Sequence, residues 1–290
     1  MANLKEIRNR ISSVASTMQI TSAMKMVSAA KLKRAQDAIV AMRPYAEKLQ
    51  EILSNVSTSL DASEGVYSQV RDEKTVLVVA ISSNRGLCGG FNNSILKETN
   101  RIIEKHQHAD VKVLGLGKKV FEAFEKTGNI TTEGQADLPY TIFDDLTFEN
   151  NAAVAQVIMD QFVEGKGDKV ILVYNKFKNA AVQITTAEQF LPVLPQETLD
   201  SATAIQYEFE PSKEFIVNEI IPKSLKTQLY KALLDSHASE HGARMTAMHK
   251  ATENATELRG ELLLHYNKAR QAAITNEILE IVGGAEALNG

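Results

Sequence analysis

The stretch that decides the fold runs from Lys223 to Val282 and reads KSLKTQLYKALLDSHASEHGARMTAMHKATENATELRGELLLHYNKARQAAITNEILEIV. It follows the last proline of the chain and is rich in Ala, Leu, Glu, Lys, Met, Gln and Arg, which favour helices. As a single helix these residues would span roughly 90 Å. A compact domain does not contain a helix of that length, so we expect a partner helix along most of it.

The N-terminal segment supplies that partner. Stepping from Leu4 alternately by three and four residues as far as Leu60, 14 of the 17 positions are apolar. This spacing is typical of a coiled-coil seam. Pro44 is expected to kink this helix or to tie its register to another part of the structure.

One band of the seam is unusual. Its three polar positions fall together, at Thr21, Lys25 and Ser28. The apolar residues of the same band, Met24, Met26 and Val27, lie off the seam. We therefore expect an antiparallel helical pair with one band where apolar side chains face outward, available to a partner.

The composition is that of an ordinary globular protein: 290 residues, 44% hydrophobic and 23% charged. No apolar run is long enough for a transmembrane helix, and the N-terminus lacks the apolar core of a signal peptide. The single cysteine, Cys88, excludes an internal disulfide and suits a cytosolic setting.

Charge is distributed unevenly. Residues 1–58 carry nine Lys and Arg against four Asp and Glu, a net charge of +5, which leaves −9 for the rest of a chain whose net charge is −4. A basic helix on an acidic protein indicates either an acidic partner surface or simply a solvated face. A nucleic-acid-binding coiled coil is disfavoured, because the cations are not interleaved with aromatic residues.

The middle of the chain predicts an α/β domain. Near-continuous apolar runs at Thr75–Ser82, Val111–Leu116 and Lys169–Tyr174 indicate strands buried on both faces. Helical patterns separate them, so the strands are expected to be parallel. A further strand, Ala181–Phe190, follows a short turn. The expected fold class is thus α/β, with a long antiparallel coiled coil of the two termini and an inserted Rossmann-like domain.

The expected organisation has three parts. Residues 1–60 and 208–290 form a helical shaft, residues 74–191 form the globular α/β domain, and residues 61–73 and 192–207 are linkers or an irregular foot.

The loop Ser82–Asn92 (SSNRGLCGGFN) follows the first strand and opens a helix, where a phosphate-binding loop would lie. It fits neither the dinucleotide nor the P-loop pattern, so its glycines are interpreted as serving helix–strand packing. An enzyme that binds a nucleotide here remains the alternative function. Cys88 has no histidine partner in sequence. His237 and His241 are spaced for a metal, but no HExxH motif is formed. We expect no catalytic residue, cofactor or metal.

Three stretches together resemble one known family. The first is Ile20–Lys31 (ITSAMKMVSAAK), the second Arg85–Asn92 (RGLCGGFN), and the third Ile274–Ala287 (ITNEILEIVGGAEA). They are similar, in order, to the N-terminal, central and C-terminal motifs of the gamma subunit of bacterial F-type ATP synthases. The resemblance covers the whole chain.

This resemblance implies a rotating central shaft without catalytic activity, present in one copy per complex. The implied partners are the alpha and beta subunits, the epsilon subunit and the c ring, with the protein peripheral to the cytoplasmic face of the bacterial cell membrane. Rotation would couple proton flow to ATP synthesis or hydrolysis in the alpha–beta ring, because an asymmetric shaft contacts the catalytic subunits differently.

The resemblance also implies contact residues. Those expected to meet the alpha–beta ring are Met24, Lys25, Met26, Val27, Arg244, Arg270 and Gln271. Those expected to meet the c ring or the epsilon subunit are Tyr207, Phe209 and Glu210, where Phe209 lacks the hydroxyl that the family often has.

Overall fold

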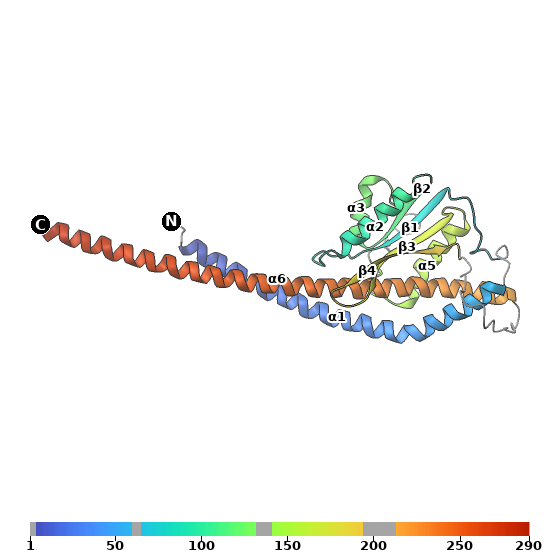
Figure 1. The fold of residues 1–290 in the computed structure, drawn as a ribbon, viewed down its shortest axis with the longest axis horizontal. Coiled ribbons are helices and arrows are strands. Elements are labelled where there is room, and N and C mark those ends of the chain that lie inside the picture. The colour runs from blue at the N-terminus through green and yellow to red at the C-terminus, as the bar shows by residue number, and fades with distance from the viewer. Residues whose placement is uncertain (1–3, 60–64, 132–140, 194–212, 290) are drawn as a thin grey trace. The chain divides into compact units, whose positions relative to one another are not determined.

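The computed structural model describes residues 4–59, 65–131, 141–193 and 213–289 (Figure 1). In chain order its elements are α1 (Leu4–Ser59), β1 (Thr75–Ile81), α2 (Phe91–Lys105), β2 (Asp110–Leu116), α3 (Lys118–Phe124), the 3-10 turn η1 (Glu125–Thr127), α5 (Phe148–Val163), β3 (Lys169–Phe177), β4 (Gln183–Leu191) and α6 (Lys213–Asn289). The expected combination of long terminal helices and an inserted α/β domain is confirmed.

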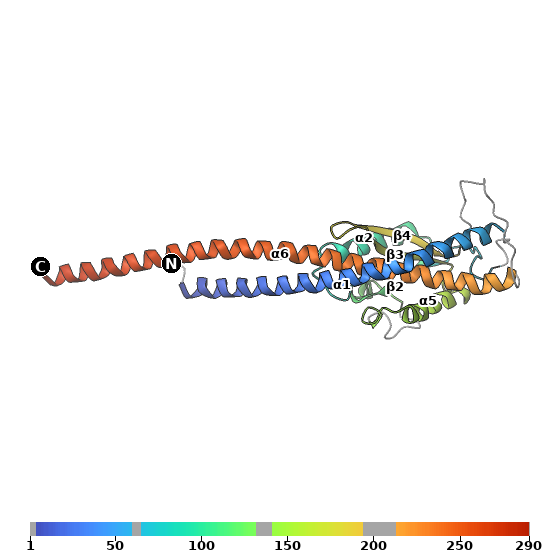
Figure 2. The ribbon, with the colours of Figure 1, turned by 90° about the horizontal axis from the view of Figure 1, so that it is seen from below.

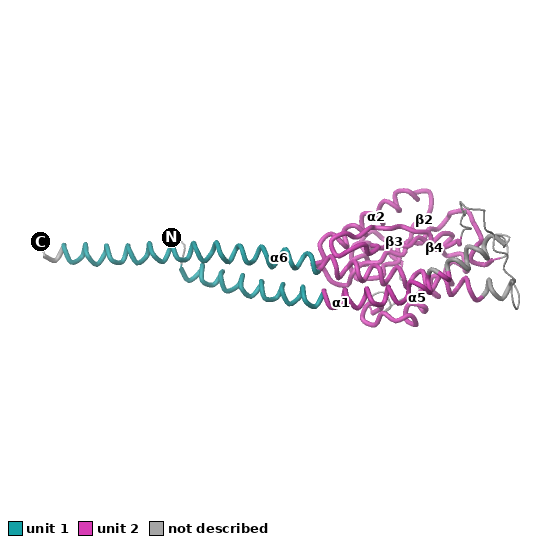
Figure 3. Tube along the Cα trace, turned by 60° about the horizontal axis from the view of Figure 1, so that its bottom comes forward, with its two compact units in different colours: residues 1–28, 245–290 teal, residues 29–244 magenta. Residues whose placement is uncertain are grey.

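Two compact units make up the chain (Figure 3). Unit 1 comprises residues 1–28 and 245–290, and unit 2 comprises residues 29–244. Unit 2 thus contains not only the sheet but also the second part of α1 and the first part of α6, which the sequence assigned to the shaft.

The sheet of unit 2 has the strand order β2-β1-β3-β4. β1 pairs in parallel with β2, with Val76 opposite Val111, and also in parallel with β3. β4 is antiparallel to β3, as expected for two strands joined by a short turn. In that turn the side chain of Asn179 accepts hydrogen bonds from the amides of Ala181 and Val182, at 3.0 and 2.7 Å.

Helices cover both faces of this sheet (Figure 1). Because side chains alternate along a strand, the odd residues of β1 (Leu77, Val79 and Ile81) face α5 and the first part of α6. The even residues (Val76, Val78 and Ala80) face α2 and α3. Burial on both faces explains why the strand sequences are almost entirely apolar.

Both long helices continue through a proline, Pro44 in α1 and Pro222 in α6. The sequence assigned residues 208–290 to the shaft, and α6 begins at Lys213, upstream of Pro222. Pro222 is flanked by Ile221 and Leu225, which are both buried in the sheet's core. Burying two such side chains stabilises by roughly 1.5–3 kcal/mol each, which offsets the cost of about 3 kcal/mol for a proline inside a helix.

The Gly283-Gly284 pair does not end α6 either, since the helix runs to Asn289. A Cβ atom at either glycine would meet nothing within 4 Å, so close packing does not require these glycines. Among the described residues, no helix combines the length and the apolar character that crossing a lipid bilayer demands.

Candidate functional site

In unit 1, the first part of α1 runs beside α6, whose C-terminal end extends past the start of α1 (Figures 1 and 2). The hydroxyls of Thr21 and Thr252 lie 2.8 Å apart. Closer to the N-terminus, Arg8 Nη2 donates to the hydroxyl of Tyr266 at 2.7 Å and lies over its ring. As the residue number rises along α1 it falls along α6, so the two helices are antiparallel, as the seam predicted.

The polar band of the seam includes side chains that turn toward the inside of this helix pair. Ser28 is only 2% exposed and donates to the carbonyl of Met24 at 2.8 Å, and Thr21 is also buried. Because each buried hydroxyl has a hydrogen-bond partner, the band keeps its polar residues without an unsatisfied group. Of the three polar seam positions, Thr21 and Ser28 are therefore buried, whereas Lys25 is only half-buried.

Of the three apolar residues of the same band, Met26 and Val27 lie on the outside, whereas Met24, also expected to face outward, is half-buried. Met26 is 64% exposed and Val27 is 58% exposed, with the nearby Ile20 similarly open. Met24 and Lys25 are half-buried, and Lys25 Nζ lies 3.4 Å from His249 Nδ1 on α6. A patch of exposed Met, Val and Ile side chains suits an adaptable contact with another protein.

The C-terminal part of α6 is open to solvent. Arg270 and Gln271 are exposed, and so is each residue from 271 to 286. Five large apolar side chains share this exposure: Ile274, Ile278, Leu279, Ile281 and Val282. Such a segment gains little from the rest of its own chain, which is typical of a surface that a partner covers.

The carboxyl end of the sheet, in unit 2, is where a Rossmann-like domain would bind a ligand. The strand order reverses between β1 and β3, and ligands of open α/β sheets bind at such a point. Here Asn175, at the end of β3, donates to the carbonyl of Phe91 at 3.1 Å. Its own carbonyl accepts a hydrogen bond from Ser239 of α6 at 2.8 Å. The polar groups of Asn175 are thus bound by the chain's own groups at this end of the sheet.

The loop that would cradle a phosphate makes hydrogen bonds within itself: the amide of Ser83 donates to Asn92 Oδ1 at 3.1 Å, and that of Phe91 donates to the Cys88 carbonyl at 3.3 Å. At the start of α3, the amide of Lys118 donates to Asn84 Oδ1 at 3.1 Å, and that of Val120 donates to Ser82 Oγ at 3.0 Å. Gly117 has φ +117°, and a Cβ there would lie 2.2 Å from the Ser82 carbonyl oxygen. These contacts argue against phosphate binding by the loop. The interpretation of its glycines as packing residues is wrong, because a Cβ atom at Gly86, Gly89 or Gly90 would meet nothing within 4 Å.

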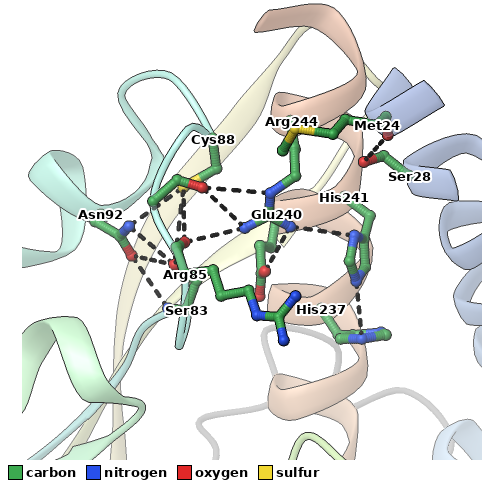
Figure 4. A network of polar contacts seen from close by, with 11 residues as sticks. Met24, Ser28, Ser83, Arg85, Cys88, Asn92, His237, Glu240, His241 and Arg244 are labelled. Carbon is green, nitrogen blue, oxygen red and sulfur yellow. Dashed lines mark hydrogen bonds and ion pairs between the residues drawn. The ribbon is translucent and has the colours of Figure 1, made fainter. Parts of the chain in front are cut away.

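Arg244 connects α6 to this loop (Figure 4). Its side chain is nearly buried, with the residue 7% exposed, and Nη1 forms an ion pair of 2.7 Å with Glu240. Nη2 donates to the Arg85 carbonyl at 3.0 Å, and Nε lies 3.4 Å from the Gly86 carbonyl oxygen. Burial raises the pKa of Glu240, and the charge of Arg244 opposes that shift. The guanidinium is thus saturated within its own chain.

Two histidines extend this network. Arg244 Nη1 lies 3.3 Å from His241 Nδ1, and since a guanidinium only donates, Nδ1 must accept. The proton of neutral His241 is then on Nε2, which lies 3.1 Å from His237 Nε2. Burial lowers the pKa of His237 to about 4 and that of His241 to about 3, and nearby positive charge contributes to both. These neutral rings hydrogen-bond to each other.

Cys88 is enclosed by the same loop. Its Sγ accepts from Asn92 Nδ2 at 3.2 Å, and it packs in a small cluster with Phe91 and Ala243. Burial raises the pKa of the thiol, the opposite of what a nucleophilic cysteine needs. No three His, Cys, Asp or Glu side chains within the described ranges are arranged to hold a metal ion.

Sequence reasoning singled out Arg244 but missed its partners. Glu240 lies one helical turn before it, a spacing that often forms ion pairs and that gave an unused signal. The carbonyls of Arg85 and Gly86 left no signal, because main-chain acceptors are present at every residue. Tyr207, Phe209 and Glu210, expected to contact the c ring or the epsilon subunit, lie outside the described residues.

A family model described as ATP synthase matches residues 3–288. The ATP synthase gamma chains of Flavobacterium johnsoniae and Geobacter metallireducens are 62% and 45% identical to this chain, and in each case 100% of both chains is covered.

Solved structures of ATP synthases also contain chains with a similar fold. The central stalk and c-ring structure of the Tetrahymena thermophila mitochondrial ATP synthase matches with a TM-score of 0.54 and 26% identity, covering 80% of this chain and 99% of that chain. A chain of the Euglena gracilis mitochondrial ATP synthase in rotational state 3 matches with a TM-score of 0.69 and 21% identity, covering 98% and 94%. The second match is evidence of the fold alone.

Proposed function

The chain belongs to the ATP synthase gamma-chain family, and on this premise we propose that it is the central rotor shaft of a bacterial F-type ATP synthase. It couples proton flow through the membrane sector to ATP synthesis or hydrolysis in the alpha–beta ring by rotating. One copy serves each complex, at the cytoplasmic face of the cell membrane, and the chain is itself non-catalytic.

One observation in unit 1 supports this proposal most directly. The two ends of the chain form an antiparallel helical pair whose polar seam is satisfied internally, while Met26 and Val27 face outward. Beyond the pair, residues 271–286 of α6 are exposed and carry five large apolar side chains. A stiff helical element with apolar surface left uncovered is what a shaft inside a ring of other subunits requires.

We propose that the contacts with the alpha and beta subunits are made by Met24, Lys25, Met26, Val27, Arg270 and Gln271. The basic first helix supports an acidic partner segment for this band, because opposite charges favour encounter. Turning the shaft would then present a different surface to each catalytic subunit and stabilise a different conformation of it. Tyr207, Phe209 and Glu210 remain our proposed contacts with the c ring and the epsilon subunit.

Arg244 takes a different place in this scheme. Its guanidinium is buried and bound to groups of its own chain. We therefore propose that Arg244 acts on the alpha–beta ring in two ways: by direct hydrogen bonds and by holding the loop that contains Arg85 and Gly86.

Reconstitution tests the proposal. We expect the purified chain to hydrolyse no ATP by itself, and addition of alpha and beta subunits to give a stable complex with ATPase activity. Failure to join such a complex would refute the rotor function. Saturable micromolar binding of ATP to the isolated chain would instead support the alternative of a nucleotide-binding enzyme.

A matched pair of variants tests the contact band. Met26→Glu places a charge in the exposed apolar patch, whereas Glu257→Gln changes an exposed polar residue of α6 elsewhere in unit 1. We expect Met26→Glu to impair ATPase activity or its coupling in the assembled complex and Glu257→Gln to leave both unchanged. Equal behaviour of the two variants would remove Met26 from the proposed contacts.

A further inference from the structure

The loop that Arg244 contacts has an unusual backbone conformation for an exposed segment. Arg85, Gly86 and Leu87 are exposed, and Leu87 is 64% exposed with a φ of +61°. A leucine in this left-handed region costs roughly 1–2 kcal/mol relative to its usual conformations. Cβ atoms added to Gly86, Gly89 or Gly90 would meet nothing within 4 Å. The packing of side chains around these glycines therefore does not explain how the loop keeps its shape.

Hydrogen bonds to main-chain carbonyls do explain it. Arg244 donates to both the Arg85 and the Gly86 carbonyl oxygens, from Nη2 and Nε. Ser83 Oγ also donates to the Arg85 carbonyl, at 2.6 Å. The other side of the guanidinium is held by Glu240 and His241. Two consecutive carbonyls are thus bound by one planar group whose orientation is set from α6.

We propose that Arg244 is a positioning residue, a latch from α6 that holds the loop Ser83–Asn92 in one conformation and keeps Cys88 shielded. The latch joins the loop after β1 to α6, and the Ser239–Asn175 hydrogen bond joins β3 to the same helix. Its mechanical consequence, that α6 and the sheet of unit 2 move as one body under load, rests on the proposed rotor function. The latch itself is a property of unit 2 alone.

The planar guanidinium of arginine suits this position better than the ammonium group of lysine does. A lysine at position 244 would keep a positive charge for Glu240, but its single ammonium lacks the planar fork that bonds two carbonyls and a carboxylate together. Arg244→Lys should therefore loosen the loop while preserving the ion pair. Arg244→Gln with Glu240→Gln removes both buried charges at once and so avoids an unpaired carboxylate.

Cys88 is a natural reporter, because it is the one cysteine of the chain. Its rate of modification by a thiol reagent such as 5,5′-dithiobis(2-nitrobenzoic acid) measures how often the loop opens. Loss of the two carbonyl hydrogen bonds should raise this rate about tenfold. The peptide bond after Arg85 provides a second reporter, since trypsin cleaves there once the loop is mobile.

The experiment uses the full-length chain with Arg244→Lys, with the double change Glu240→Gln/Arg244→Gln, and with Arg259→Gln as a control at an exposed arginine of α6. A cysteine introduced at Ala155, a fully buried residue of α5, reports global unfolding in each background. We expect faster modification at Cys88 and faster cleavage after Arg85 in both latch variants, with no change at position 155 or in the control.

Unchanged Cys88 modification in both latch variants would overturn the proposal. An equal acceleration at Cys88 and at position 155 would also overturn it, because Arg244 would then only stabilise the whole domain. Since labelling is measured on the chain alone, this outcome is independent of assembly. A chain that showed the latch but never joined alpha and beta subunits would refute the rotor function and leave the latch intact.

Discussion

The buried pair His237 and His241 predicts a loss of stability on mild acidification. Both pKa values are lowered in the folded protein, to about 4 and about 3, whereas an unfolded histidine titrates near 6.5. Above pH 6.5 neither state binds a proton at these rings, so their contribution does not change with pH. Below pH 6.5 the two histidines bind protons in the unfolded state but not in the folded state, so the free energy of unfolding falls.

The size of the effect follows from the width of this window. At pH 5, about 1.5 pH units below the unfolded pKa, each histidine should have lowered the free energy of unfolding by at most about 2 kcal/mol relative to its value at pH 7.5. The pair together should cost at most about 4 kcal/mol, a large share of the 5–15 kcal/mol that is typical of a folded domain. As neither folded ring titrates at pH 5, the magnitude depends little on how far below 5 their pKa values lie.

Neighbouring carboxyl groups act in the opposite direction. Burial raises the pKa of Asp235 and of Glu240, so the folded state binds their protons more readily and gains stability as the pH falls. A simple pH profile of the natural chain therefore contains both contributions. Comparison with a variant that lacks the two histidines isolates theirs.

The assay is urea unfolding followed by circular dichroism at several pH values between 7.5 and 5. We expect the natural chain to lose stability over this range and His237→Gln/His241→Gln to lose up to about 4 kcal/mol less. His265→Gln, at an exposed histidine of α6, is the control and should behave like the natural chain. If the double variant showed the same pH dependence as the natural chain, the assignment of these histidines as buried and neutral would be refuted.

Three further predictions concern the two units separately. Cysteines at Thr21 and Thr252, whose hydroxyls lie 2.8 Å apart, should form a disulfide within one molecule; cross-links found only between molecules would contradict the antiparallel pair. Gly117→Ala should destabilise the fold by more than about 2 kcal/mol, because the φ of +117° and the Ser82 carbonyl leave no room for a Cβ atom. Gly260→Ala, in the open interior of α6, should instead stabilise by roughly 0.5–1 kcal/mol. A similar effect of both changes in thermal unfolding would refute this account. Met26→Glu should change the free energy of unfolding by less than about 0.5 kcal/mol, while Ile7→Glu, at a buried seam position, should cost more than about 2 kcal/mol; an equal cost in denaturant titrations would show that the outward and inward faces were assigned wrongly.

Much of the fold was determined by the sequence alone. The alternating three- and four-residue spacing from Leu4 predicted a helix with one apolar seam, and the β-branched run at Thr75 predicted a strand covered on both faces. These patterns are reliable because a helix or strand repeats its geometry at each residue, so that a local spacing places side chains on a definite face. The helix α6 passes through Pro222 because burial of Ile221 and Leu225 in the sheet's core outweighs the local cost of a proline inside a helix.

The surroundings of Arg244 were decided only by the tertiary structure. Sequence spacing placed Glu240 within reach on the same helix, but nothing in it connected Arg244 with the carbonyls of Arg85 and Gly86, 159 and 158 residues away. Main-chain carbonyls are chemically alike, so which of them meets a given guanidinium depends on how α6 packs against the carboxyl end of β1. Tertiary packing also buries His237 and His241 and lowers their pKa values, because desolvation is a property of the folded environment and not of the residue.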